Sequence, residues 1–261
     1  MASTALITGA SSGIGESFAK LMAAKGHDLI LVARREEQLQ ALATDLKSAH
    51  DIKVHVWPAD LTDPQAAIAL RDRAEEEGIV VELLINNAGV IDTGPFVNRP
   101  ASKIMQVVDL NVAALTRLLH VFVTDMVERG QGKVLNVASA AAFQPTPGFC
   151  TYGATKAYVL SLTEGLSEEL RGSGVTISAL CPGVVKTPLL DIAAESSDIL
   201  NQVPDAALLD ADEVASQGYN AMMKGEVVSI AGFAYAAAEL LQRAWPRSLK
   251  RRAAGLMTRF S

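Results

Sequence analysis

Short apolar runs alternate with longer amphipathic stretches along most of this 261-residue chain. Each run has the length of a strand, and the stretches between the runs carry apolar residues at three-and-four spacing, which is typical of helices with one buried face. Parallel strands that are apolar throughout need helices on both sides. The alternation therefore predicts an α/β fold in which a parallel sheet is covered on both faces.

The apolar runs predict seven strands, at residues 5–8, 28–32, 54–57, 83–86, 134–137, 176–180 and 227–230. The amphipathic stretches predict helices at residues 16–25, 36–49, 65–77, 112–129 and 154–171. In this order the elements build a doubly wound, Rossmann-type three-layer sandwich with a seven-stranded parallel sheet.

The first 180 residues contain no Pro-, Gly- or Ser-rich linker, so residues 1–261 are predicted to form a single domain. Residues 188–212 lack a strand signal, which is typical of an excursion beside the sheet. We expect residues 188–223 to form this excursion and to supply much of a substrate wall. Its apolar side chains are Leu189, Leu190, Ile192, Ile199, Leu200, Val203, Leu208, Leu209 and Met222.

A glycine-rich turn follows the first predicted strand and opens the first helix. At this junction a doubly wound fold presents backbone N–H groups to a pyrophosphate, and glycine allows the backbone to approach closely. The spacing is GxxxGxG, and a tight strand–helix turn alone could also require these glycines. Its position favours cofactor binding by Gly9, Ser11, Ser12, Gly13, Ile14 and Gly15.

The same turn matches the GxSxG pattern of a hydrolase nucleophile, with Ser11 at its centre. In that class of enzyme the histidine of the triad follows the serine and the acid along the chain. All four histidines here lie in the first half of the sequence, at positions 27, 50, 55 and 120. A serine hydrolase is therefore the weaker alternative.

Two arginines, Arg34 and Arg35, follow the second predicted strand. An NAD-binding protein offers a carboxylate to the ribose hydroxyls at this point, whereas a guanidinium suits a 2′-phosphate. The pair predicts a preference for NADP(H) over NAD(H). The alternative is that both arginines merely begin a charged surface helix with Glu36 and Glu37.

Several further motifs occur in a fixed order, at Asn86-Asn87-Ala88-Gly89, Asn111, Ser139, Tyr152-Gly-Ala-Thr-Lys156 and Pro182-Gly183. Together with the glycine turn they resemble the short-chain dehydrogenase/reductase family over residues 5–187. The resemblance implies an oxidoreductase in which Tyr152 transfers the proton, Lys156 lowers the pKa of that tyrosine and binds the nicotinamide ribose, Ser139 hydrogen-bonds the substrate oxygen, and Asn111 holds a relay water.

The resemblance also implies further cofactor contacts, at Asp60, Leu61, Asn87, Ala88, Gly89, Tyr152, Lys156, Pro182, Gly183, Val185 and Thr187. Asp60 could equally cap the helix that follows it. The implied reaction is reversible hydride transfer between NADP(H) and a carbonyl or alcohol. The apolar side chains of residues 188–223 favour an apolar ketone, aldehyde or secondary alcohol as substrate. A nucleotide-binding sensor or scaffold without turnover is the alternative from a different class.

Composition narrows the partners and the compartment. The net charge of −6 argues against nucleic-acid binding. Cys150 and Cys181 belong to no CxxC or His/Cys cluster, which predicts neither a disulfide nor a metal site and favours a reducing, cytoplasmic compartment. The longest apolar stretch, at residues 227–238, is too short to span a bilayer, so no stable membrane insertion is expected. The resemblance implies a homodimer or homotetramer.

The C-terminal tail departs from this acidic balance. Residues 243–260 carry six basic side chains and no acidic one, interleaved with Trp245, Leu249, Leu256 and Phe260. The favoured interpretation is a solvated or intersubunit surface helix, and docking on a membrane surface is the alternative.

Overall fold

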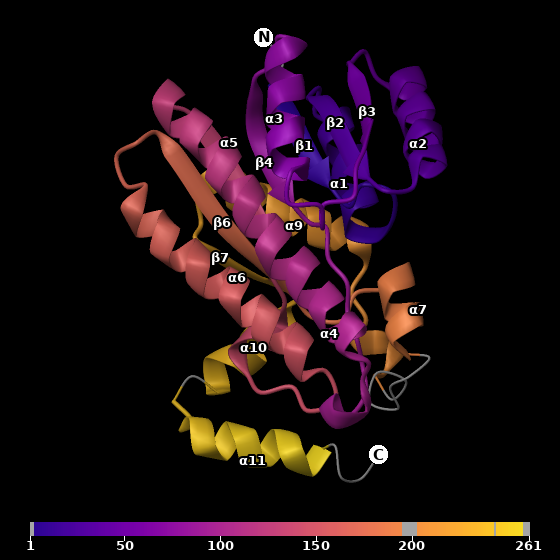
Figure 1. Cartoon of the computed structure of the whole chain (residues 1–261). Helices are drawn as coiled ribbons and strands as arrows, with labels where there is room; N and C mark the ends of the chain where they lie inside the picture. Colours follow the sequence, from indigo (N-terminus) through magenta and orange to yellow (C-terminus); the bar gives the residue numbers. More distant parts are fainter. Residues whose placement is uncertain (1–2, 195–202, 243, 258–261) are drawn as a thin grey trace.

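The computed structural model describes residues 3–194, 203–242 and 244–257. Its sheet has seven strands in the order β3-β2-β1-β4-β5-β6-β7, and every neighbouring pair is parallel. Helices cover both faces of the sheet (Figure 1). The predicted doubly wound α/β sandwich is therefore confirmed.

The strands are β1 (Thr4–Thr8), β2 (Asp28–Ala33), β3 (Val54–Pro58), β4 (Val81–Asn86), β5 (Gly132–Val137), β6 (Val175–Pro182) and β7 (Val228–Ala231). The helices are α1 (Gly13–Ala24), α2 (Glu36–Ala49), α3 (Ala66–Glu76), α4 (Ala101–Val108), α5 (Leu115–Arg129), α6 (Cys150–Glu169), α7 (Pro188–Ala194), α9 (Ala211–Lys224), α10 (Phe233–Gln242) and α11 (Arg247–Met257). Shorter helical turns are η1 (Phe96–Asn98), η2 (Asp109–Ala114), η3 (Ala140–Phe143) and η4 (Asp205–Ala207).

Side chains that alternate along the strands form two hydrophobic layers, one on each face of the sheet. Leu6 and Leu84 pack with residues of α3, α5 and α6. Ile7 and Leu31 pack with residues of α1, α2 and α9 on the opposite face. Because successive strand side chains point to opposite faces, strands that are apolar throughout require both layers.

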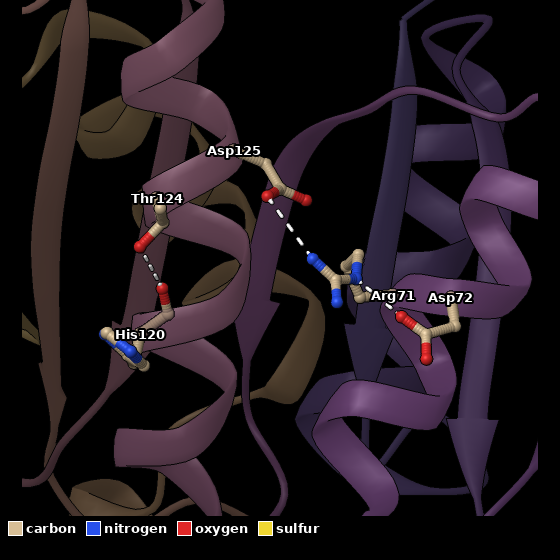
Figure 2. A network of polar contacts seen from close by, with 5 residues as sticks. All are labelled: Arg71, Asp72, His120, Thr124 and Asp125. Carbon is tan, nitrogen blue, oxygen red and sulfur yellow. Dashed lines mark hydrogen bonds and ion pairs between the residues drawn. The ribbon is translucent and has the colours of Figure 1, made fainter.

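The helix layer over β4 also has a polar rim (Figure 2). Arg71 of α3 binds Asp72 of the same helix, with 2.7 Å between Nε and Oδ1, and points its Nη1 toward Asp125 of α5 at 4.0 Å. On α5, the Thr124 hydroxyl donates to the carbonyl of His120 at 2.6 Å. These contacts are partly exposed, so they contribute little next to the apolar layer beneath them.

The helix predicted at 112–129 begins earlier in the structure. It runs through Ala101–Arg129, with the π-helical segment η2 between α4 and α5. This helix is long and apolar enough to pass a length-and-composition test for a membrane span. Its residues Leu115, Leu118, Phe122 and Met126 are buried in the layer described above, which accounts for the apolar composition.

Residues 188–223 were expected to form an excursion that supplies much of a substrate wall, and this is wrong for their second half. That half is α9, whose face packs on α1 and on β5, β6 and β7. Met222 is fully buried in the core beneath the sheet, so it cannot line a substrate wall. A Cβ on Gly218 would lie 2.7 Å from Leu180, which shows how closely α9 approaches the sheet. Ile199 and Leu200 lie outside the described residues.

A chain of buried side-chain hydrogen bonds crosses the middle of the sheet. Asn86 Nδ2 of β4 donates to Asn136 Oδ1 of β5 at 3.0 Å. Asn136 Nδ2 donates in turn to the hydroxyl of Thr163 on α6 at 2.9 Å, and Thr163 donates to the carbonyl of Val159. This chain links the two strands to the helix that carries Tyr152.

We predict that Asn136→Leu lowers the free energy of unfolding by about 2–4 kcal/mol, because the amide of Asn86 then loses its buried acceptor. Urea denaturation measures the change, with the same substitution at exposed Asn220 as the matched control. A loss at Asn136 no larger than that at Asn220 would contradict this role.

Candidate active site

The glycine turn lies at the carboxyl end of β1, where the sheet reverses its strand order between β1 and β4. Gly9 and Gly13 have φ of 68° and 58°, which favours glycine. A Cβ on Gly9 would lie 2.8 Å from Asn87 Nδ2, and one on Gly15 would overlap the carbonyl of Gly9. The glycines therefore let the turn pack closely against Asn87, and the turn lines a cavity at the position where a pyrophosphate binds in this fold.

The segment after β4 is tied to this turn. The Thr8 hydroxyl accepts from the backbone N–H groups of Asn87 and Ala88, both at 3.0 Å. The amide of Asn87 donates to the carbonyl of Thr8 at 2.9 Å. Asn87, Ala88 and Gly89 thus reach the cleft beside the turn, and the side chain of Asn87 has a structural role there.

The two arginines after β2 face different groups. Arg35 donates to the hydroxyl of Ser11 from Nη2 at 2.9 Å and to that of Ser12 at 2.7 Å. The pKa of Asp60 is lowered mainly by its hydrogen bonds with Thr62 and to a smaller extent by the charge of Arg34. Asp60 binds the backbone N–H and hydroxyl of Thr62, so its carboxylate shapes the turn after β3.

These segments line one cavity. Its wall contains Gly9, Ser11, Ser12, Gly13 and Ile14, followed by Arg34, Arg35, Asp60, Leu61, Asn87, Ala88 and Gly89, and then Thr187. Of the predicted contacts from the glycine turn, Gly15 is buried behind this wall. The glycine turn, with the Arg35 guanidinium bound to Ser11 and Ser12, fits the phosphates of a nicotinamide dinucleotide.

Tyr152 is the third residue of α6 and faces Ser139, which follows β5. Burial raises the pKa of Tyr152 above its usual value, and a hydrogen bond with Ser139 opposes this shift. The Ser139 hydroxyl also accepts from the N–H of Ala141 at 3.1 Å, which fixes it at the start of η3. Tyr152 is accordingly a neutral phenol at neutral pH in this arrangement.

Lys156 lies one helical turn after Tyr152 and is only 5% exposed. Its Nζ donates to the carbonyl of Val137 at 2.8 Å and lies 5.7 Å from the centre of the Tyr152 ring. Burial lowers the pKa of Lys156 to about 8. The lysine is therefore still mostly protonated at pH 7, but its charge is poorly solvated.

Asn111 lies in the π-helical segment η2, and its amide makes three hydrogen bonds within the protein. Its Oδ1 accepts from Val90 N at 2.9 Å, and its Nδ2 donates to Val90 O at 2.9 Å and to Thr155 Oγ1 at 3.1 Å. The relay water that the resemblance places on Asn111 stays a prediction. What the contacts establish is that Asn111 fixes the β4–α4 loop next to α6.

A second cavity contains Ser139, Tyr152 and Lys156 and joins the first through shared residues at Ile14, Asn87, Gly89, Thr187 and Leu189. Predicted contacts Pro182, Gly183, Val185 and Thr187 line it. A Cβ on Gly89 would lie 3.2 Å from Asn111 Oδ1 and 3.5 Å from Lys156 Nζ, so only glycine leaves this junction open. One continuous cleft therefore joins the glycine turn to Tyr152.

Sequence reasoning missed several wall residues of this second cavity, namely Ile91, Gln144, Thr146, Phe149 and Tyr235. Phe149 could have been found, because it precedes Tyr152 by three residues. Tyr235 follows the last family motif by about fifty residues, and no spacing points to it. It reaches the site because α10 returns toward η3, and its ring occupies the space that a side chain on Gly183 would need.

The serine hydrolase alternative finds no support at Ser11. Its hydroxyl accepts from Arg35, and no hydrogen bond joins it to a histidine within the described residues. His27 instead binds Ser3 and Tyr219, while His55 faces Glu77. Among residues 3–194, 203–242 and 244–257, no group of three or more His, Cys, Asp or Glu could hold a metal ion.

Most residues of this cleft lie in the part of the chain that matches a known protein family. The family model described as short chain dehydrogenase matches residues 3–197. The chain belongs to the short-chain dehydrogenase/reductase family. It is thus one of the NAD(P)-dependent dehydrogenases and reductases, and the predicted family is confirmed.

Among solved structures, the chain resembles a short-chain dehydrogenase from Sphingobium yanoikuyae in complex with NADPH, at 37% identity and a TM-score of 0.83, covering 98% of this chain and 95% of that one. A Burkholderia phymatum family member in complex with NAD is 29% identical, with a TM-score of 0.82 and 92% of each chain covered. A curated relative, hydroxysteroid dehydrogenase-like protein 1 from Gallus gallus, is 30% identical over 74% of this chain, which spans 59% of that protein.

The buried ammonium of Lys156 leads to a pH-dependent prediction. Its pKa is lower in the folded protein than the 10.5 of an unburied lysine, so between about pH 8 and 10.5 the unfolded chain binds more protons. The stability of the wild type therefore gains from this group as the pH rises through that window. Lys156→Met removes the gain.

We predict that the free energy of unfolding of Lys156→Met, relative to wild type, is higher at pH 7 than at pH 10 by about 2 kcal/mol. Urea denaturation at several pH values measures it, and Lys47→Met, at an exposed site, is the matched control. If the Lys156→Met difference stayed constant from pH 7 to pH 10, the ammonium would not be destabilised by burial.

Proposed function

We propose that this protein is an NADP(H)-dependent oxidoreductase that transfers a hydride between the nicotinamide and the carbon of an apolar ketone, aldehyde or secondary alcohol. The observation that carries the proposal is that Ser139, Tyr152 and Lys156 line one cavity, which is continuous with the glycine turn. A nucleotide-binding sensor would not require a proton donor at this point.

Bound NADPH supplies the hydride that adds to the carbonyl carbon. The residues of this chain provide the rest. Ser139 donates a hydrogen bond that holds the carbonyl oxygen, and Tyr152 protonates that oxygen as negative charge develops on it. The raised pKa of Tyr152 keeps the proton on the phenol until the substrate arrives. In the direction of alcohol oxidation, Tyr152 must accept the proton, and the nearby Lys156 ammonium favours the phenolate.

Lys156 and the glycines position the nicotinamide end of the cofactor. The Nζ of Lys156 keeps two of its three hydrogens after donating to Val137, and Gly89 leaves the space beside it open. An ammonium that faces this space can bind the hydroxyls of the nicotinamide ribose.

The apolar wall supports an apolar substrate. Phe149, Leu189, Leu190, Val184 and Ala193 surround the space in front of Tyr152. The polar side chains Thr146 and Tyr235 in the same wall are bound to backbone carbonyls, at Phe149 and Ala207 respectively. A substrate whose body lacks charge therefore loses little on leaving water.

We also expect a homodimer or homotetramer in a reducing cytoplasm. The support for the compartment is that Cys150 and Cys181 are free thiols. The support for the oligomer is the family assignment.

Tyr152→Phe should reduce turnover at least about 100-fold, because a general acid contributes a factor of that order. NADPH binding, measured by fluorescence titration, should stay within about twofold, since the ring and the path to the glycine turn are kept. Full turnover in Tyr152→Phe would refute the mechanism, whereas a wild type that binds NADPH and never oxidises it would favour a sensor.

Arg34→Asp and Arg35→Asp test the cofactor preference. At least one of them should weaken NADPH binding about tenfold or more, through loss of a charge-assisted bond to the 2′-phosphate, while NADH binding holds or improves. The control is Arg171→Asp, at an exposed arginine near the end of α6 that pairs with Glu168. An unchanged NADPH to NADH ratio in both variants would overturn the NADP preference.

A further inference from the structure

The helix α10 exposes an apolar face. Phe233, Leu240 and Leu241 are 91%, 66% and 74% exposed. Positions seven and eight residues apart lie on the same side of a helix, so these three side chains form one stripe. The opposite side of α10 is used, because the helix packs on β7 and η3 and Tyr235 enters the active-site wall. The stripe therefore faces away from the body of the protein.

The next helix, α11, carries positive charge. Arg247, Arg251 and Arg252 of α11 are exposed, and Lys250 is half-buried. Trp245 and Leu249 beside them are 45% and 47% exposed. Large apolar side chains next to clustered arginine and lysine are the composition of helices that lie in the interface of a lipid bilayer.

The charge of the chain is strongly divided. Six of its 23 basic residues and none of its 29 acidic residues lie in the tail 243–261. Residues 1–242 therefore carry a net charge of −12, against +6 for the tail. Such a chain meets an anionic surface in one orientation, with the tail toward the surface and the acidic body away from it.

That orientation also brings the active site to the surface. The helices α10 and α11 lie at the same end of the sheet as α4 and α7 (Figure 1). The cleft opens at this end, since Tyr235 of α10 and Leu189 of α7 both line it. An apolar substrate dissolved in a bilayer would meet the cleft close to the lipid.

We propose that the exposed stripe of α10 and the basic helix α11 dock the protein on an anionic phospholipid surface. A second copy of the chain fits this surface less well. In a two-fold dimer the same patch meets itself, which would bring two sets of arginines together with only Glu239 of each α10 as an acidic residue between positions 233 and 257. Phosphate groups of a lipid surface neutralise the arginines while the acyl region takes up Phe233, Leu240 and Leu241.

Co-sedimentation of the full chain with vesicles tests the proposal. We expect binding to vesicles that contain one quarter phosphatidylglycerol in phosphatidylcholine, weaker binding in high salt, and little binding to phosphatidylcholine alone. Arg251→Glu/Arg252→Glu should weaken binding at least about tenfold. Leu240→Ser/Leu241→Ser tests the apolar stripe and should also weaken it.

The matched control is Lys47→Glu/Lys53→Glu, which makes the same charge change at exposed positions on α2 and before β3. It should bind vesicles as the wild type does, and thermal unfolding verifies that each variant is folded. The proposal is overturned if the wild-type protein does not co-sediment with anionic vesicles. Light scattering tests whether the stripe is instead an intersubunit contact. The proposal is also overturned if Leu240→Ser/Leu241→Ser dissociates an oligomer and leaves vesicle binding unchanged.

Discussion

The buried ammonium of Lys156 is the contact on which the arrangement of the active site depends. Its Nζ binds the carbonyl of Val137 at the end of β5, which fixes α6 against the sheet. The same helix carries Tyr152 one turn earlier, so the position of the phenol follows from the position of the lysine. Burial of this charge is unfavourable, as its pKa of about 8 shows. The fold therefore tolerates a destabilising group at the point where a cation beside a phenol is chemically useful.

The parallel sheet brings the remaining parts of the cleft together. All seven strands point the same way, so the loops after β1, β2, β3, β4, β5 and β6 meet at one edge. The arginines and the glycine turn stand at one end of the cleft, where we propose that they bind the phosphates of the cofactor. The phenol and serine stand at the other end, in apolar surroundings. The proposed binding site for the phosphates of the cofactor is therefore separated along the cleft from the site of proton transfer.

Much of this could be predicted from the sequence, because the responsible signals are local. Strand lengths and helical spacing are set by residues close together in the chain, and the motifs at Gly9, Asn87, Ser139 and Tyr152 follow the ends of strands. The residues of the substrate wall were harder to predict from the sequence. Met222 is apolar, as a wall residue would be, but it lies in the core because α9 covers the sheet. Tyr235 comes from a helix whose path is decided only by packing on β7 and η3. Contacts between distant segments leave no spacing to detect.

The most direct test of the account follows the hydrogen that the reaction moves. Wild-type enzyme would be supplied with NADPH carrying deuterium at either position of nicotinamide C4, together with a panel of apolar ketones and aldehydes, and the alcohols analysed by mass spectrometry. Hydride transfer from the nicotinamide predicts one deuterium at the carbinol carbon from one of the two labelled cofactors and none from the other. Alcohol formed without deuterium from both cofactors, or no alcohol from any carbonyl in the panel while NADPH remains bound, would contradict it.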